Sequence, residues 1–194
     1  GRVAVALPGD IKDEAFCKEL VQKSIDQFDS IDILVNNAGK QEFQEDLQDI
    51  TTEQFVDTFT TNVFAMFWIT KALVPYMPAG ASIINTTSIQ SYRPSPGLLD
   101  YSSTKGAITS FTKSLAKMLA PQGIRVNAVA PGLIRVEATE GVPEDRYRTY
   151  AAGRALDREQ TPQDVAGVVR FLLSEDAAFV TGQTIVVDGG FIFR

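Results

Sequence analysis

Short apolar runs rich in β-branched residues alternate along this chain with longer stretches of helical periodicity. The runs predicted as strands are residues 3–7, 31–39, 81–88, 124–132 and 184–190. The stretches predicted as amphipathic helices are residues 13–29, 51–77, 101–120 and 161–176. Because the strands are continuously apolar, this order predicts an α/β protein whose parallel sheet is covered by helices on both faces.

The composition limits the function classes. Of the 194 residues, 44% are hydrophobic and 22% are charged, which is ordinary for a globular protein. The formal net charge of −6 argues against a nucleic-acid-binding surface. No apolar run is long enough to cross a membrane and no secretion signal is recognisable, so we expect no membrane partner and a cytoplasmic location. No repeat or linker interrupts the pattern, which predicts one domain over residues 1–194.

The chain contains no histidine and a single cysteine, Cys17. The absence of histidine removes the commonest metal ligand and the usual general base, so we expect no metal site. Cys17 lies at a helical position within residues 13–29. We interpret it as a buried helix thiol rather than a nucleophile, because no histidine can activate it. Any chemistry must therefore come from other side chains.

Small and polar residues follow the predicted strands. They are residues 9–10 (GD), 36–39 (NNAG), 86–88 (TTS) and 130–132 (APG). The carboxyl ends of parallel strands share one edge of a sheet, and open α/β sheets bind their ligands there. Small residues allow the backbone to approach a ligand closely, so this edge suits a flat cofactor.

The stretch YSSTK places a phenol and an ammonium on one face of the predicted helix 101–120. Tyr101 and Lys105 are four residues apart, so they lie one turn from each other. A neighbouring ammonium favours the phenolate and lowers the phenol's pKa from its usual value of about 10. Ser88, at the end of the preceding strand, can hold a carbonyl or alcohol oxygen beside the phenol. These residues predict proton transfer on a C–O bond, although such a pair alone is more often a half-exposed aromatic beside a solvated lysine.

The ordered set of motifs resembles the short-chain dehydrogenase/reductase family. The matching segments are LVNNAG (34–39), Asn62, Ser88 ahead of Tyr101, YSSTKGAI (101–108), GIRVNAVAPG (123–132) and VTGQTIVVDGG (180–190). The resemblance runs from about residue 3 to residue 190. It implies a Rossmann-type, doubly wound parallel sheet in three α/β/α layers. It also implies an NAD(P)-dependent oxidoreductase that interconverts an alcohol with an aldehyde or ketone.

The resemblance implies a role for each of four catalytic residues. Tyr101 would be the general acid/base, and Lys105 would lower its pKa and hold the nicotinamide ribose. Ser88 would position the substrate oxygen, and Asn62 would help to hold a water in a proton relay. Without the resemblance, Asn62 is a polar residue in a packed helix and Ser88 is an ordinary strand-end hydroxyl.

The resemblance also implies which residues contact NAD or NADP. They are Asp10 and Ile11 at the adenine, Asn36, Ala38 and Gly39 along the adenosine, Tyr101 and Lys105 at the ribose, and Pro131, Gly132 and Ile134 at the nicotinamide. Asn37 is expected to brace the sheet instead. The choice between NAD and NADP is made at the end of the second strand of this fold, which has no counterpart in the sequence.

Two features depart from the family pattern. Residues 3–7 match the family's third strand, so the first two strands and the Gly-rich phosphate-binding turn have no counterpart. We expect the natural protein to have such a segment, since the remaining site is intact and a bare sheet edge is unfavourable; a genuine fragment is the alternative. In addition, Val136 stands where the family usually has a cofactor-contacting threonine, and that contact is either lost or supplied by Thr139.

Residues 133–158 are polar, and we expect a loop-rich lid over the substrate. Arginines stand at positions 135, 146, 148, 154 and 158, and we interpret them as belonging to a solvated loop rather than an anion site. The residues expected to line the pocket are Gln90, Tyr92, Tyr147 and Tyr150, which fit many small alcohol or carbonyl substrates.

The predicted helix 51–77 carries an apolar stripe at Phe55, Phe59, Val63 and Phe67. With helix 101–120 it is expected to form a homodimer or homotetramer, as the family commonly does. Two functions besides an enzyme stay open: a non-catalytic dinucleotide-binding sensor and an inactive fragment. Sensors of this kind usually lose the tyrosine or the lysine, and the presence of both favours an enzyme.

Overall fold

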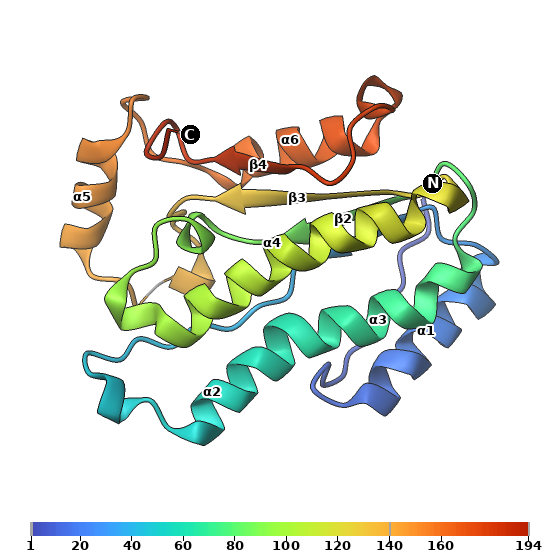
Figure 1. Ribbon diagram of the computed structural model, residues 1–194, viewed down its shortest axis with the longest axis horizontal. Helices are drawn as coiled ribbons and strands as arrows, with labels where there is room; N and C mark the ends of the chain where they lie inside the picture. Colours follow the sequence, from blue (N-terminus) through green and yellow to red (C-terminus); the bar gives the residue numbers. More distant parts are fainter. Residues whose placement is uncertain (1, 140, 194) are drawn as a thin grey trace.

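Four parallel strands form the sheet in the computed structural model, which describes residues 2–139 and 141–193 (Figure 1). The strands are β1 (Ile33–Asn36), β2 (Ser82–Thr86), β3 (Arg125–Pro131) and β4 (Thr184–Val187). They lie side by side in chain order, and each pairs in parallel with the next. Parallel neighbours need a long crossover between them, and helices supply it here. The predicted α/β fold class is confirmed.

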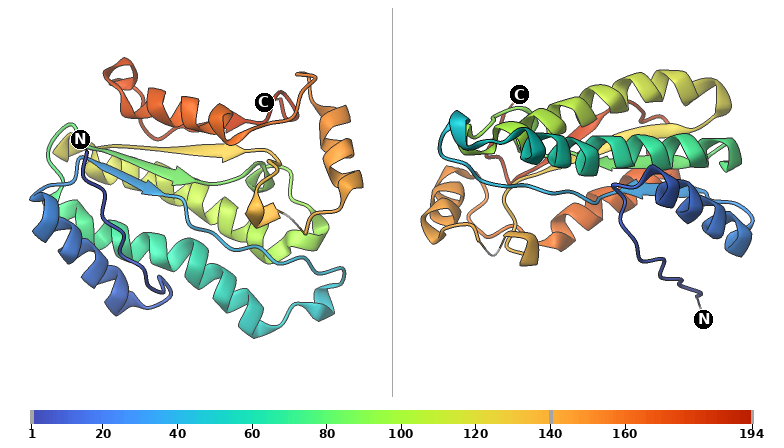
Figure 2. Two further views of the ribbon diagram at one scale, coloured as in Figure 1. Left: turned by 180° about the vertical axis from the view of Figure 1, so that it is seen from behind. Right: turned by 90° about the horizontal axis from the view of Figure 1, so that it is seen from below.

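Helices cover both faces of this sheet. They are α1 (Glu14–Phe28), α2 (Thr52–Phe59), α3 (Ala65–Leu73), α4 (Leu99–Leu119), α5 (Glu144–Gly153) and α6 (Pro162–Leu173). A π-helical segment, Thr60–Phe64, joins α2 to α3. Short 3-10 turns lie at Leu47–Asp49, Val74–Tyr76, Ile89–Ser91, Pro96–Leu98, Ala120–Gln122, Glu137–Thr139 and Glu175–Ala177. Figure 2 shows α3 and α4 on one face of the sheet and α6 on the other, which gives three layers.

Side-chain caps explain where several helices begin. Asp13 accepts a hydrogen bond from the backbone N–H of Ala15 ahead of α1, and Thr51 accepts one from Gln54 ahead of α2. Ahead of α6, Thr161 and Asp164 form a reciprocal capping box, and proline fills the first helical position. The helices predicted to begin at residues 13, 51 and 161 therefore begin one residue later, because each of these residues is the N-cap.

The core has two parts, one on each side of the sheet. Because neighbouring side chains of a strand point to opposite faces, Ile83 and Ile84 of β2 belong to different clusters. Ile83 packs beside Val21 of α1, and Ile84 packs beside Leu172 of α6. The described helices include none that is both long and apolar enough to span a membrane.

The predicted helix 51–77 is divided by the π-helical segment and ends at Leu73. Two further predicted segments differ in kind. Residues 3–7 form no strand, and Val3 and Val5 are 71% and 45% exposed. A strand needs a hydrogen-bonding partner, and no described strand lies beside this segment (Figure 2). The same lack of a neighbour leaves Ile33 and Val35 of β1 exposed at the sheet edge. Residues 133–158, predicted as loop-rich, contain helix α5.

Candidate active site

The carboxyl edge of the sheet brings together the predicted catalytic residues. β2 ends at Thr86, and Ser88 follows as the N-cap of the 3-10 turn Ile89–Ser91. Tyr101 lies in the first turn of α4, where its phenol and the Ser88 side chain form a hydrogen bond. Lys105 lies one turn further along, with its Nζ 5.3 Å from the centroid of the Tyr101 ring. The spacing in YSSTK therefore does place both groups on one helix face beside Ser88.

Lys105 is a buried cation, only 3% exposed. Its Nζ donates a hydrogen bond to the carbonyl of Thr86 at 2.9 Å, and burial lowers its pKa to about 8. An ammonium has three N–H donors, and the Thr86 carbonyl uses one of them. A Cβ on Gly39 would lie 3.5 Å from this Nζ, so the remaining donors are close to the bare backbone at the sheet edge.

The pKa of Tyr101 is raised rather than lowered. Burial of the half-buried phenol is the main cause, the hydrogen bond with Ser88 acts in the opposite direction, and the nearby Tyr150 adds to the rise. The lowering by Lys105 that the sequence predicts is absent from this geometry. The reason is that the ammonium lies over the ring and is turned to the Thr86 carbonyl. In this state the phenol is therefore held as a proton donor.

Asn62 lies in the π-helical segment between α2 and α3 and is buried. Such π segments are frequent at functional sites. Its Oδ1 accepts from the Lys40 N–H at 2.7 Å, and its Nδ2 donates to the Lys40 carbonyl at 2.9 Å and to Thr104 Oγ1 at 3.0 Å. Thr104 precedes Lys105 on α4. Asn62 thus fastens the backbone that follows Gly39 to the helix that carries Tyr101.

A buried carboxylate that the sequence analysis missed lies directly before Tyr101. Asp100 has no exposed surface, and its Oδ1 accepts from the Tyr101 backbone N–H at 2.7 Å. Its Oδ2 accepts from Thr58 Oγ1 at 2.8 Å and from Gln54 Nε2 at 3.1 Å. An acidic residue in a first helical turn ordinarily has a solvent-exposed role at the helix dipole, so the residue pattern does not predict this contact to α2.

In the segment NNAG, Asn36 is half-buried and the three following residues are exposed. Asn36 donates to Asn85 Oδ1 at 2.9 Å and to Thr70 at 3.2 Å, so its amide braces the sheet and α3. Asn37 accepts from Thr86 Oγ1 at 3.0 Å. Ala38 and Gly39 are exposed at the strand end. The two small residues, rather than the asparagine amides, leave open backbone at this edge.

Asp57 of α2 joins two segments of the predicted cofactor side. It binds Lys40 Nζ at 2.6 Å and Lys12 Nζ at 3.0 Å, and these two bonds hold the pKa of Asp57 below its usual value. Lys12 directly follows Asp10 and Ile11. The predicted adenine-contacting pair therefore lies on a loop that is tied to the segment after Gly39.

The turn after β3 has no room for a side chain at Gly132. Its N–H donates to the Val187 carbonyl at 3.0 Å, and a Cβ there would lie 2.8 Å from Gln160 Oε1. Pro131 ends β3 beside Val187 of β4. The Pro-Gly pair is thus a close-packed turn at the same edge as Ser88.

A cavity of about 280 Å³ lies beside β4, away from the catalytic side chains. Arg154 and Arg158 line part of it.

Thr139 closes the turn that follows Ile134. Its Oγ1 lies 2.7 Å from the Ile134 carbonyl and accepts from the Val136 N–H at 3.0 Å. The Tyr147 hydroxyl donates to the Thr139 carbonyl at 3.0 Å and lies 2.8 Å from its Oγ1. The Thr139 hydroxyl is therefore committed to this turn. Tyr147, expected to line the pocket, is buried against the turn instead.

Tyr150 of α5 is the residue of this region that faces the catalytic group. Gln90 Nε2 donates to the Tyr150 hydroxyl at 3.3 Å, and the Gln90 backbone N–H donates to Ser88 Oγ at 3.2 Å.

Cys17 is buried, as predicted, with its thiol directed to the Ile11 carbonyl at 3.2 Å. Among the described residues, no three acidic or thiol groups are placed to hold a metal ion.

Comparison with known proteins matches this fold and site. A family model described as "Enoyl-(Acyl carrier protein) reductase" matches residues 1–192. The oxidoreductase YhxD of Bacillus subtilis is 46% identical over 195 residues, which cover 98% of this chain and 65% of that protein. The chain therefore spans slightly less than two thirds of that relative's length.

Solved structures agree with the sequence matches. A short-chain dehydrogenase/reductase from Brucella melitensis, described as a glucose/ribitol dehydrogenase, superposes with a TM-score of 0.91 at 31% identity, over 96% of this chain and 75% of that one. A blue fluorescent protein from a metagenomic library, in complex with NADPH, gives 0.89 at 34% identity, over 95% and 74%. The chain belongs to the short-chain dehydrogenase/reductase family.

Proposed function

We propose that this protein is an NAD(P)-dependent oxidoreductase that interconverts an alcohol with an aldehyde or ketone. The observation that carries the proposal is the Tyr101 phenol, which is hydrogen-bonded to Ser88 and lies beside the buried ammonium of Lys105. A phenol and a hydroxyl that converge on one point suit an oxygen that gains or loses a proton. The family membership supports the same reaction class.

The residues at the sheet edge fit a nicotinamide dinucleotide. Lys105 keeps unused N–H donors next to the bare backbone of Gly39, where ribose hydroxyls would find them. We assign the adenine side to Asp10 and Ile11, the adenosine side to Asn36, Ala38 and Gly39, and the nicotinamide side to Pro131, Gly132 and Ile134. NADPH is bound by one of the similar structures, which makes NADP a cofactor to test beside NAD.

In the reduction direction, Tyr101 donates its proton to the carbonyl oxygen, and Ser88 hydrogen-bonds the same oxygen. When bound, the cofactor would supply the hydride. The raised pKa of Tyr101 keeps the phenol protonated before the reaction. In this proposal, the Lys105 ammonium then turns from the Thr86 carbonyl toward the phenol and stabilises the phenolate that forms. Asn62 holds the backbone near Gly39 and, in our proposal, a water through which Tyr101 recovers its proton.

Residues 133–158 form the substrate side in this proposal. Tyr150 reaches the Ser88 region through Gln90, and we assign α5 to a lid that closes over the substrate. Closure would exclude water from the proton transfer and leave only small carbonyl compounds room beside the phenol.

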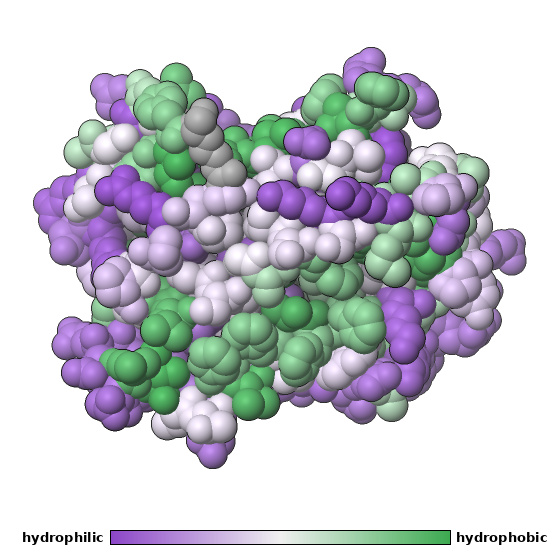
Figure 3. Space-filling model, viewed as in Figure 1, coloured by the Kyte–Doolittle hydropathy of each residue, from purple (hydrophilic) through white to green (hydrophobic). Residues whose placement is uncertain are grey.

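A second copy of the chain is the proposed partner for helices α2, α3 and α4. Figure 3 shows apolar side chains gathered mainly over α2 and α3. The exposed members are Phe55, Phe64, Phe67, Leu99 and Met118. A patch of this kind on a water-exposed face is typical of a subunit interface. Light scattering tests it: a dimeric or tetrameric mass is expected, and a monomer would remove this part of the proposal.

The deciding experiment is a titration with NADH and with NADPH, followed by energy transfer from Trp68. Saturable binding of either, together with its oxidation when a carbonyl compound is added, is the expected result. A Tyr101→Phe variant separates an enzyme from a sensor, because an enzyme loses turnover and keeps binding. Failure of both cofactors to bind would contradict the proposal for this chain.

A further inference from the structure

Helix α5 carries an arginine and a tyrosine on one face, toward the catalytic residues. Arg146 and Tyr150 are four residues apart and therefore one turn apart. The Tyr150 ring stacks on Phe191 with 4.5 Å between centroids, and the guanidinium of Arg93 lies 4.8 Å from the centroid of Phe191. A continuous set of contacts thus leads from Ser88 through Tyr150 to Arg93, and Arg146 lies one helical turn from Tyr150.

These arginines are held by rings and hydroxyls instead of carboxylates. Arg146 lies 5.1 Å from the centroid of Phe43 and donates to Ser95 Oγ at 3.1 Å. Within residues 2–139 and 141–193, neither Arg93 nor Arg146 is in an ion pair, whereas Arg135 and Arg158 each are. Stacking orients the planar guanidinium and leaves its N–H donors free for another group.

The positive charge reaches the space beside the catalytic phenol. Burial raises the pKa of Tyr150, and Arg146, Arg93 and Arg154 each act against that rise. Tyr150 in turn raises the pKa of Tyr101. Arg154 is already committed, because it donates to the carbonyls of Leu133 and Arg158. Of the three arginines that act on Tyr150, Arg93 and Arg146 therefore keep capacity to bind a ligand.

We propose that the carbonyl substrate carries an anionic group, a carboxylate or a phosphate, that Arg93 and Arg146 bind while Tyr101 engages the carbonyl oxygen. The inference rests on the proposed oxidoreductase function and names its substrate class. Guanidinium groups match the geometry of both oxyanions, and such charge-assisted bonds are stronger than neutral ones. Among the arginines of residues 133–158, we therefore assign only Arg146 to this anion site; the others are solvated, in ion pairs or bound to backbone carbonyls.

Matched substrates test the proposal. Reduction of succinic semialdehyde is compared with butanal, and glycolaldehyde phosphate with glycolaldehyde, so that each pair differs in the anionic group. We expect a higher kcat/KM for at least one anionic member, and an Arg93→Gln or Arg146→Gln change should raise its KM about ten- to hundredfold. The neutral members should keep their kinetics. Equal efficiency within both pairs, or an equal loss for neutral and anionic members, would overturn the proposal.

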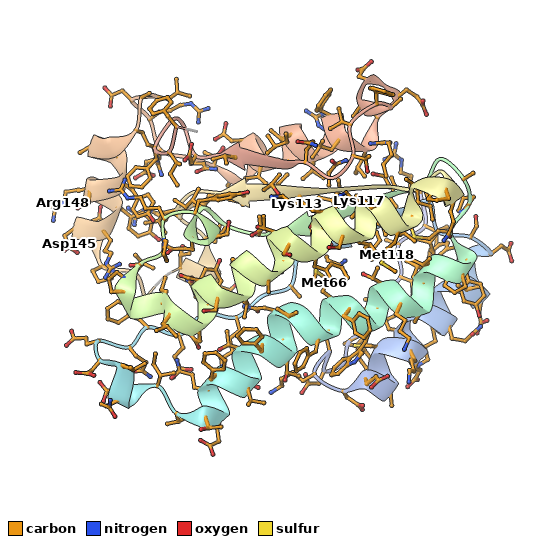
Figure 4. The ribbon with its side chains drawn as sticks, viewed as in Figure 1. Met66, Lys113, Lys117, Met118, Asp145 and Arg148 are labelled. Carbon is orange, nitrogen blue, oxygen red and sulfur yellow. The ribbon has the colours of Figure 1, made fainter. Side chains whose placement is uncertain are left out.

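Arg148→Gln provides the matched control. Arg148 is exposed on the same helix, and Figure 4 shows it directed away from the body of the molecule. Its replacement removes the same charge from α5, so unchanged kinetics would assign the effect to the inner face. An Arg146→Lys change keeps the charge without the planar stacking, and we expect it to recover only part of the affinity. A KM increase in Arg148→Gln as large as in Arg146→Gln would contradict a specific site.

A binding measurement separates this inference from the proposed function. Calorimetric titration with succinate and with inorganic phosphate requires no turnover. Binding to the wild type that Arg93→Gln and Arg146→Gln weaken supports the anion site even if no carbonyl is reduced, in which case the oxidoreductase proposal falls. Reduction of neutral carbonyls without any anion binding leaves the oxidoreductase proposal standing and removes this one.

Discussion

The two sides of the proposed active site are held in place by different kinds of interaction. On the side of β2 and α4, buried polar groups such as Asp100 and Lys105 hydrogen-bond to segments far away in the sequence. On the α5 side, Arg146 and Tyr150 rest on aromatic rings and are half-buried. Satisfied buried hydrogen bonds fix one geometry, whereas partly exposed stacking contacts allow adjustment. The difference suggests a fixed proton-transfer group and an adaptable substrate side.

The largest expected effect is the loss of the phenol itself. A Tyr101→Phe change should lower kcat about a hundred- to ten-thousandfold, because it removes a general acid while leaving the ring in place. Cofactor affinity and melting temperature should change little. Steady-state kinetics measure kcat, and the NADH and NADPH titrations measure cofactor affinity. Retained turnover in this variant would show that the fixed side does not perform the proton transfer.

The second effect is on stability at the fixed side. An Asp100→Ala change removes the acceptor for three buried donors, from Gln54, Thr58 and the Tyr101 backbone. We expect a loss of about 2–4 kcal/mol in the free energy of unfolding, measured in urea. Asp145→Ala is the control, since Figure 4 shows Asp145 directed away from the molecule on α5. Similar losses in the two variants would mean that the buried carboxylate of Asp100 contributes no more stability than the outward-facing carboxylate of Asp145.

The sequence was informative about the fixed side because its key residues follow one another at helical and strand-end spacings. The period of a helix was enough to predict that Tyr101 and Lys105 share a face. The end of a strand was enough to predict the place of Ser88. The fold class needed only the alternation of apolar runs and amphipathic stretches. These features are local, so tertiary contacts did not change them.

Other features depended on partners that a linear pattern does not contain. Residues 3–7 have strand composition but no neighbouring strand in the structure, and α5 lacks the apolar periodicity of a core helix. The role of Asp100 depends on Thr58, forty-two residues away. The pKa of Tyr101 is set mainly by burial, which residue spacing does not report. Each miss concerns a property of packing between distant segments.

A smaller effect on stability, which depends on pH, is expected when Lys105 is replaced. Its pKa of about 8 in the folded chain lies below the value of about 10.5 expected when unfolded, so burial of the charged form costs stability below pH 8. A Lys105→Met change should therefore raise the free energy of unfolding at pH 7 by about 1–3 kcal/mol, although it removes turnover. The free energy of unfolding of the wild type should rise toward that of the variant as the pH rises from 8 toward 10.5.

Urea unfolding at pH 7 and pH 9.5 measures the change at Lys105. Lys113→Met and Lys117→Met are matched controls, because both lysines are exposed on the same helix (Figure 4). They should shift stability little, and equally at the two pH values. If Lys105→Met is less stable than the wild type at pH 7, the ammonium contributes to the fold, and the view that it is held at a cost for function is wrong.

The smallest effect should come from the adaptable side. A Tyr147→Phe change removes the hydroxyl that donates to the Thr139 carbonyl, and we expect a loss of about 0.5–1.5 kcal/mol, confined to residues 133–158. Limited proteolysis should show faster cleavage in this segment, while the global unfolding transition moves little. Tyr76→Phe, at an exposed tyrosine, is the control. If Tyr147→Phe instead lowers global stability as much as Asp100→Ala, the α5 side is as firmly built as the catalytic side. Its contacts would then position the substrate rigidly rather than adapt to it.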